Sequence, residues 1–226
     1  SSGTTGKPTV VGYTRGDIET WSESLARALT SLGLSRDDVV QVGYGYGLFT
    51  GGLGLHYGAE RMGAAVLPVG TGNTERQIEL MQDLGTTAIA CTPSYFLHIM
   101  EVAEKMGVSI RNDTQLKVGI FGAEPWSLET RKRIEANTGI NAYDIYGTSE
   151  ISGPLFTECQ AKNGIHVWGD MFLTEVVDPD TGEPVAEGEQ GELVFTTLHK
   201  FALPLIRYRI GDLSVMSNEV CECGRT

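Results

Sequence analysis

The first seven residues, Ser1 to Lys7, read Ser-Ser-Gly-Thr-Thr-Gly-Lys and combine hydroxyl groups, two glycines and a cation. Glycine lets backbone amides approach an anion closely, while Ser, Thr and Lys side chains add donors and a positive charge. A polyphosphate suits such a loop. The segment differs from a Walker A loop, because Gly3 and Gly6 are too close in sequence and Pro8 stands where Ser or Thr is needed. The alternative is a Ser/Gly-rich terminus without a ligand.

Two further polar motifs lie downstream. The first is Tyr146-Gly147-Thr148-Ser149-Glu150, which follows an expected strand, and the second is Tyr208-Arg209-Ile210-Gly211-Asp212. In sheets of parallel strands, ligands bind beyond the carboxyl ends of the strands, which is where the first motif stands. Each motif alone has a structural alternative, since a Tyr at a strand end usually packs and a Gly-Asp pair usually forms a turn.

The three motifs together, in this order and near this spacing, resemble the signature motifs of the adenylate-forming ligases. Within that superfamily the chain is similar to the phenylacetate–coenzyme A ligases, on the segments 44–52, 121–125 and 203–208. The resemblance covers nearly all 226 residues. It implies ATP-dependent activation of an aryl carboxylic acid, phenylacetate first among them, through an acyl-adenylate to a coenzyme A thioester.

The resemblance also assigns expected roles to single residues. Adenylation needs mainly positioning and charge neutralisation. The expected catalytic residues are Lys7 on the β- and γ-phosphates, Ser149 near the α-phosphate, and Glu150 as the Mg²⁺ ligand. Tyr146 would stack on adenine and Asp212 would accept from the ribose hydroxyls. The remaining expected nucleotide contacts come from Ser2, Gly3, Thr4, Thr5, Gly6, Gly122, Ala123, Glu124, Gly147, Thr148 and Arg207.

Three aromatic residues in a glycine-rich stretch are candidates for the acyl pocket. Tyr44, Tyr46 and Phe49 lie between Gly43 and Gly54. Aromatic rings flanked by glycines leave room for a flat substrate, and the family likeness favours an arylacetate. Ordinary packing of aromatic side chains is the alternative, and a related aryl acid would fit equally well.

Three of the four cysteines and one histidine form a candidate metal site. Cys91 follows an apolar run and is expected to be an inert core thiol. Cys159, His166, Cys221 and Cys223 carry the ligand types of a tetrahedral Cys₃His zinc site. Free surface thiols are the alternative, because Cys-x-Cys is less diagnostic than Cys-x-x-Cys.

Composition narrows the classes of partner. The formal net charge is −12 and the isoelectric point is near 4.7, which argues against a nucleic-acid surface. No apolar run approaches the ~20 residues of a membrane span. We therefore expect only small-molecule partners, namely an aryl acid, ATP and coenzyme A, with no nucleic acid and no membrane. The chemistry and the free thiols favour the cytoplasm, and a homodimer is a possible assembly.

Helix-like and strand-like segments alternate over the first two thirds of the chain. This alternation predicts an α/β fold with a mostly parallel sheet flanked by helices in residues 1–153, and strand-only patterns predict a smaller β-rich subdomain in 154–226. Predicted helices span 15–32, 53–62, 74–84, 93–106 and 127–137. Predicted strands span 9–13, 38–44, 64–69, 88–91, 116–121, 141–146, 171–177, 191–197 and 213–216.

The resemblance further implies that a segment before the phosphate loop and a C-terminal domain with a mobile catalytic lysine are absent from this chain. Two other functions stay open. One is adenylation of another aryl acid for a different thiol acceptor. The other is a nucleotide-binding or zinc-stabilised module without catalysis.

Overall fold

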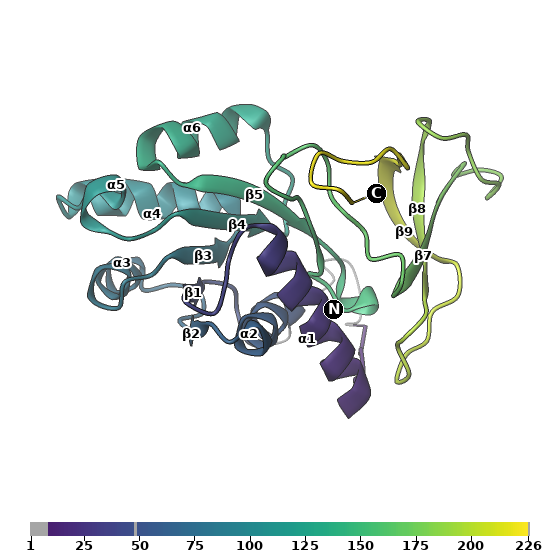
Figure 1. Cartoon of the computed structure of the whole chain (residues 1–226), viewed down its shortest axis with the longest axis horizontal. Helices are drawn as coiled ribbons and strands as arrows, with labels where there is room; N and C mark the ends of the chain where they lie inside the picture. Colours follow the sequence, from purple (N-terminus) through teal and green to yellow (C-terminus); the bar gives the residue numbers. More distant parts are fainter. Residues whose placement is uncertain (1–8, 48, 226) are drawn as a thin grey trace.

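A computed structural model describes residues 9–47 and 49–225, and its two β-sheets lie side by side (Figure 1). The first sheet has the strand order β2-β1-β3-β4-β5-β6. All its strand pairs are parallel except β5 with β6. Its strands are β1 Val39–Val42, β2 Ala65–Leu67, β3 Ala88–Cys91, β4 Val118–Gly122, β5 Asn141–Tyr146 and β6 Phe156–Thr157. The predicted fold class is confirmed.

Helices cover both faces of this sheet. They are α1 Arg15–Ser31, α2 Thr50–Met62, α3 Thr74–Asp83, α4 Pro93–Lys105, α5 Ile110–Asp113 and α6 Leu128–Thr138. Alternate strand residues feed two separate cores. Ala88 and Ala90 face the core that contains Leu25 and Leu55 of α1 and α2. Ile89 and Cys91 face the core built with α3, α4, α5 and α6.

The second sheet is antiparallel, in the order β7-β8-β9. Its strands are β7 Phe172–Val177, β8 Gln190–Thr197 and β9 Tyr208–Val215. β9 is longer than the predicted strand 213–216 and contains the whole motif from Tyr208 to Asp212. The prediction of a strand over 9–13 was wrong. These residues run without strand pairing because Tyr13 instead stacks on Trp21 of α1, with ring centroids 5.0 Å apart.

Three phenylalanines join the two sheets into one core. Phe156 of β6 lies with its ring centroid 5.2 Å from that of Phe172 and 5.5 Å from that of Phe195, and all three are buried. The same core extends to α1 and α2. β6 follows residue 153 in sequence yet extends the first sheet, and the division of the chain after residue 153 stays a prediction.

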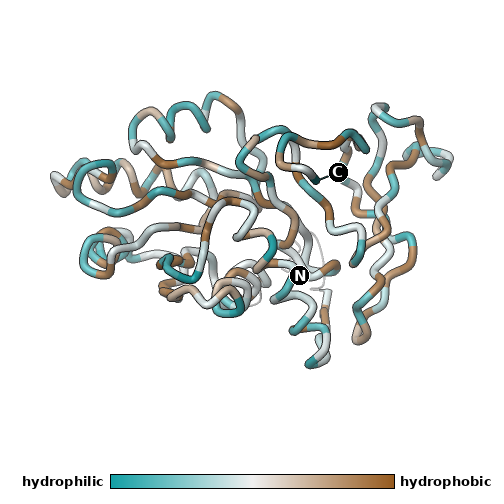
Figure 2. The backbone as a smooth tube through the Cα atoms, viewed as in Figure 1, coloured by the Kyte–Doolittle hydropathy of each residue, from teal (hydrophilic) through white to brown (hydrophobic). Residues whose placement is uncertain are grey.

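The distribution of hydropathy follows this layering. Hydrophobic residues lie along the strands, whereas the outer turns of α6 are hydrophilic (Figure 2). Only Ile134 and Thr138 of α6 are buried, so one face of that helix meets the sheet and the rest meets water. None of the described helices combines the length and the apolar character that spanning a bilayer requires.

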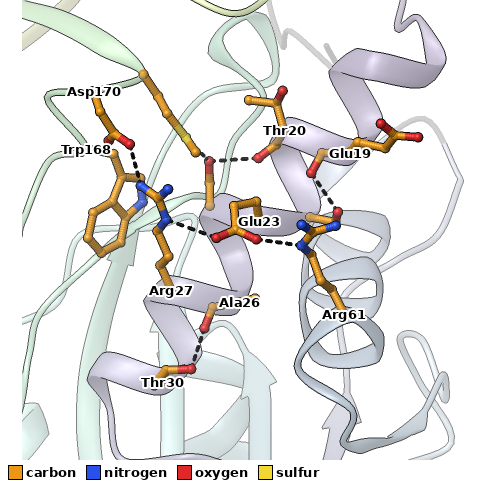
Figure 3. Close-up of polar contacts among 12 residues, drawn as sticks. Glu19, Thr20, Glu23, Ala26, Arg27, Thr30, Arg61, Trp168 and Asp170 are labelled. Atoms are coloured by element: carbon orange, nitrogen blue, oxygen red, sulfur yellow. Dashed lines mark hydrogen bonds and ion pairs between the residues drawn. The ribbon is translucent and has the colours of Figure 1, made fainter.

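An ion-pair network ties α1 to its neighbours. The Glu23 carboxylate accepts from Arg27 at 3.2 Å and from Arg61 of α2 at 2.6 Å, and Arg27 also donates to Asp170 at 2.7 Å (Figure 3). The hydrogen bond from Arg61, more than any other group, lowers the pKa of Glu23. Because exposed pairs contribute at most about 1 kcal/mol each, the network orients α1 against α2 and the segment before β7 more than it stabilises them.

We predict that Phe195→Ala destabilises the protein by about 3–5 kcal/mol, because it removes a buried ring from the core between the sheets. The measurement is the free energy of unfolding from a urea titration. Leu173→Ala, on the neighbouring strand at a residue that is 54% exposed, is the matched control and should change stability by about 0.5 kcal/mol or less. Equal effects of the two variants would contradict the shared core.

Candidate functional site

Two of the sequence motifs meet at the carboxyl end of β5. The Tyr146 hydroxyl, at the last residue of β5, donates a hydrogen bond of 2.6 Å to Oδ2 of Asp212 in β9. Burial raises the pKa of Tyr146, and the adjacent Asp212 carboxylate raises it further, so the phenol remains a donor. Asp212 is exposed, and its Oδ1 has no hydrogen-bond partner among the described residues. This oxygen is open to donors from a ligand.

The rest of the first motif forms a tight turn directly after Tyr146. A 3₁₀ helix, η1, spans Ser149–Ile151. Backbone segments touch at its base, where a Cβ on Gly147 would lie 2.8 Å from the Cα of Gly153. Only glycine allows that approach, so the chain doubles back and presents η1 beside the end of β5.

The polar side chains of η1 have few protein partners. Ser149 Oγ lies 3.3 Å from Oγ1 of Thr50, at the start of α2. Glu150 is half-buried, and its carboxylate makes no hydrogen bond or ion pair within the described part of the chain. The Thr148 hydroxyl is buried and likewise has no partner among the residues described. The Ser149 and Glu150 oxygens are therefore available to a ligand or a cation.

The end of β4 lies next to β5 in the sheet, and three of the predicted nucleotide contacts, Gly122, Ala123 and Glu124, begin at its last residue. A Cβ on Gly122 would come within 2.1 Å of the Ile145 carbonyl oxygen, so glycine is required there. Ala123 is exposed and has a left-handed φ of 67°. Glu124 Oε1 accepts from the Ser94 amide, in the first turn of α4, at 2.7 Å. One carboxylate oxygen of Glu124 is thus used to cap a helix.

Other predicted nucleotide residues are placed less centrally. The Arg207 guanidinium pairs with Glu175 of β7 at 3.2 Å and donates to the Gly182 carbonyl at 3.1 Å, so its contacts lie within the second sheet and its turn. Its role toward a nucleotide stays a prediction. Ser2, Gly3, Thr4, Thr5, Gly6 and Lys7 lie outside the described residues.

The three aromatic candidates for the acyl pocket differ in environment. Tyr44 is buried, its hydroxyl donates to the Cys91 carbonyl at 2.7 Å, and its ring centroid lies 5.9 Å from that of Phe49. Tyr46 is half-buried and bonds Nδ1 of His56 at 3.3 Å, and burial raises the pKa of Tyr46 to about 12. Tyr44 therefore packs in the hydrophobic core, while Tyr46 and Phe49 retain accessible surface.

The four predicted metal ligands come together. The ligand atoms of Cys159, His166, Cys221 and Cys223 all lie within 4.8 Å of one another. The Sγ atoms of Cys159 and Cys221 are 3.7 Å apart, and Cys223 Sγ is 3.4 Å from His166 Nε2. A disulfide would need about 2.05 Å between sulfurs. The C-terminal turn is thereby brought against the segment after β6 (Figure 1).

Three residues outside the predicted site touch the η1 region, namely Tyr13, Thr50 and Lys200. Thr50 contacts Ser149, and the Tyr13 hydroxyl donates to the Ser149 carbonyl at 3.2 Å. Lys200 Nζ donates to Ser152 Oγ at 2.7 Å. These contacts span 48 to 136 residues of sequence, so no local spacing signals them.

The chain is similar to curated enzymes over nearly its whole length. The phenylacetate-coenzyme A ligase of Aromatoleum evansii is 54% identical to the chain over 216 residues, which are 95% of this chain and 49% of that protein. The enzyme of the same name from Thermus thermophilus is 52% identical over 228 residues, covering all of this chain and 51% of that protein. The chain therefore spans about half the length of the curated relatives it matches.

A solved structure and a family model also match this chain. A 2-hydroxyisobutyryl-CoA ligase crystallised with 2-HIB-AMP and CoA superposes with a TM-score of 0.94 at 33% identity, covering 100% of this chain and 49% of that one. The family model described as AMP-binding enzyme matches residues 1–199. On these matches, the chain belongs to the AMP-binding enzyme family.

Proposed function

We propose that this chain forms the nucleotide- and acyl-binding part of an acid–coenzyme A ligase that activates an aryl carboxylate, phenylacetate first among them. The observation that carries the proposal is the hydrogen bond between Tyr146 and Asp212, which joins two family motifs from different sheets at one strand end. The relatives named phenylacetate-coenzyme A ligase support the choice of substrate.

In the proposed reaction, a carboxylate oxygen of the acid attacks the α-phosphorus of ATP. The bond to the bridging oxygen of pyrophosphate breaks, and an acyl-adenylate forms. The thiol of coenzyme A then attacks the acyl carbonyl, and AMP leaves. The protein contributes mainly position and charge, as adenylation requires no covalent enzyme intermediate.

Each residue of the site has a proposed task. The Tyr146 ring lies against adenine, with Gly122, Ala123 and Glu124 along its edge. Asp212 keeps Oδ1 for a ribose hydroxyl while Oδ2 holds Tyr146. The Ser149 hydroxyl donates toward the α-phosphate. The Glu150 carboxylate, which has no partner among the described residues, fits a Mg²⁺ ligand, and Mg²⁺ when bound neutralises phosphate charge. Lys7, with the loop from Ser2 to Gly6, is proposed to bind the β- and γ-phosphates.

Tyr46 and Phe49 are the proposed walls of the acyl pocket, with Tyr44 behind them. Glycines let the start of α2 approach these residues, since a Cβ on Gly52 would lie 2.6 Å from the Gly45 carbonyl oxygen. Another aryl acid, or a thiol acceptor other than coenzyme A, would use the same residues.

The free cysteines and this chemistry favour the cytoplasm, and gel filtration would test a homodimer.

The Cys₃His cluster is proposed to hold a structural zinc ion. Two tetrahedral sulfur ligands, each about 2.3 Å from zinc, lie about 3.8 Å apart. The Cys159–Cys221 separation of 3.7 Å fits that value. With four protein ligands, no position is left for water, which is typical of structural sites. The ion would tie the C-terminal turn to the segment after β6.

We predict that Glu150→Gln, in the complete gene product, lowers pyrophosphate release by about 100-fold or more while ATP affinity changes much less. The charge acts most where Mg²⁺ neutralises the phosphates in the transition state. The measurement is pyrophosphate release with saturating ATP and phenylacetate. Glu104→Gln, at an exposed position of α4, should behave as wild type. Release near the wild-type rate would show that Glu150 is not the metal ligand.

Asp212→Ala should remove discrimination between ATP and 2′,3′-dideoxy-ATP. In the wild-type protein we expect kcat/KM to favour ATP by about 10- to 100-fold, as a hydrogen bond to a charged group contributes about 1.5–3 kcal/mol. The variant should use both nucleotides equally poorly. Asp180→Ala, in an exposed turn of the second sheet, is the control. A variant that still prefers ATP would place the ribose elsewhere.

Protein purified without added metal should contain about one zinc per chain. Cys223→Ser should lower both the zinc content and the melting temperature, because metal binding and folding are coupled. Cys91→Ala, which alters a thiol outside the cluster, should keep its zinc. A zinc-free protein whose melting curve is insensitive to chelator would leave these residues as ordinary thiols.

A further inference from the structure

Lys200 is a buried lysine that directly contacts the candidate site. It lies three residues beyond the end of β8 and is 7% exposed. Its Nζ donates to Ser152 Oγ at 2.7 Å and lies 4.0 Å from the ring centroid of Tyr13. Lysine is almost never fully buried unless it is paired, so this position calls for an explanation.

The contacts of Lys200 reach both ends of η1. Ser152 is the residue that ends η1, and it has a left-handed φ of 69°. At the other end, the Tyr13 hydroxyl donates to the Ser149 carbonyl, and the Lys200 ammonium lies over the Tyr13 ring. One cation thus contacts Tyr13, which bonds the first residue of η1, and Ser152, the C-cap that follows its last residue. Glu150 lies between these two points.

The segment that carries Lys200 is itself fixed to α1. The Asp17 carboxylate, which is 2% exposed, accepts from the amides of Phe201 at 2.6 Å and Ala202 at 3.0 Å. It also accepts from the Thr14 amide at 2.7 Å, at the start of α1. Burial would raise the pKa of Asp17, but these amides outweigh burial and lower it. The backbone next to Lys200 is therefore anchored by a carboxylate that stays charged at neutral pH.

We propose that Lys200 is a positioning residue, whose ammonium fixes the Ser149–Ile151 turn and so holds the Ser149 hydroxyl and the Glu150 carboxylate in place for adenylation. The inference rests on the proposed function. Among the described residues, the polar and ring contacts of Lys200 are with Ser152 and Tyr13. Its effect on the reaction passes through the turn.

The charges around Lys200 make the arrangement sensitive to pH. Burial lowers the pKa of Lys200 to about 8, against the opposing charges of Asp17 on α1 and Glu150 on η1. Within the described part of the chain, the other titratable groups near it are the Tyr13 phenol, whose pKa burial raises to about 12, and His199 on the same segment. As pH rises through 8, Lys200 loses its proton while Tyr13 keeps its own. The turn then loses the attraction that the cation supplies.

The test measures pyrophosphate release against pH for wild type and Lys200→Met in the complete gene product. We expect kcat of the variant to fall by about 10- to 100-fold at pH 7, the scale of a misplaced reacting group, with a smaller change in KM for ATP. The wild-type rate should decline above about pH 8, and the variant should lack that decline. Its melting temperature should be unchanged or higher, since the variant buries no charge.

Lys117→Met is the matched control. Lys117 pairs with a buried carboxylate, that of Asp38 at 2.7 Å, but it directly precedes β4 and so lies at the amino ends of the parallel strands, away from the site at their carboxyl ends. The Lys117→Met variant should have lower stability than wild type and the same pH profile of the reaction. If Lys200→Met does not fold, Ser152→Ala serves instead, and it should lower kcat and shift the alkaline decline.

The outcomes separate this inference from the proposed function. Wild-type protein that releases no pyrophosphate with any aryl acid would defeat the proposed function. An active wild type together with a Lys200→Met variant of the same kcat and pH profile would overturn the positioning role alone. A variant that loses stability and activity together, but keeps the alkaline decline, would also overturn it and make Lys200 structural.

Discussion

The geometry of the candidate site depends on how the two sheets pack against each other. Tyr146 belongs to the first sheet and Asp212 to the second, so their hydrogen bond forms only if the sheets keep one relative placement. The rings of Phe156, Phe172 and Phe195 supply that constraint. They interdigitate edge to face and stacked, and such packing tolerates little displacement. The apolar core, against which Tyr146 itself packs, thereby sets the position of the polar groups of the site.

Close backbone approach is the second constraint. At Gly122 and at the pair Gly147 and Gly153, a side chain would collide with a neighbouring backbone segment. Backbone segments therefore pack directly against one another at the end of β4 and just after β5. The glycines of these motifs serve the packing of the protein against itself, because a side chain at any of them would displace a neighbouring backbone segment.

Local pattern predicted much of this fold, and long-range packing decided the rest. The alternation of helices and strands is encoded in short periods, so the parallel sheet could be read from it. The segment 9–13 was predicted as a strand because it is β-prone, but stacking of Tyr13 on Trp21 outweighs that propensity. The Cys₃His cluster was predictable from residue types alone. By contrast, Lys200 near Ser152 follows from tertiary contacts that no spacing reveals.

The polar residues of the site lie where burial acts against them. Lys200 is buried with its charge, Glu150 lacks a partner among the described residues, and the Thr148 hydroxyl is likewise unsatisfied there. Each of these groups would be better solvated in the unfolded chain, so none is explained by stability. Groups of this kind cluster at functional sites, where ligands complete their hydrogen bonds. Their concentration at one turn, beside the strand end that Tyr146 and Asp212 mark, is the physical reason to place the chemistry there.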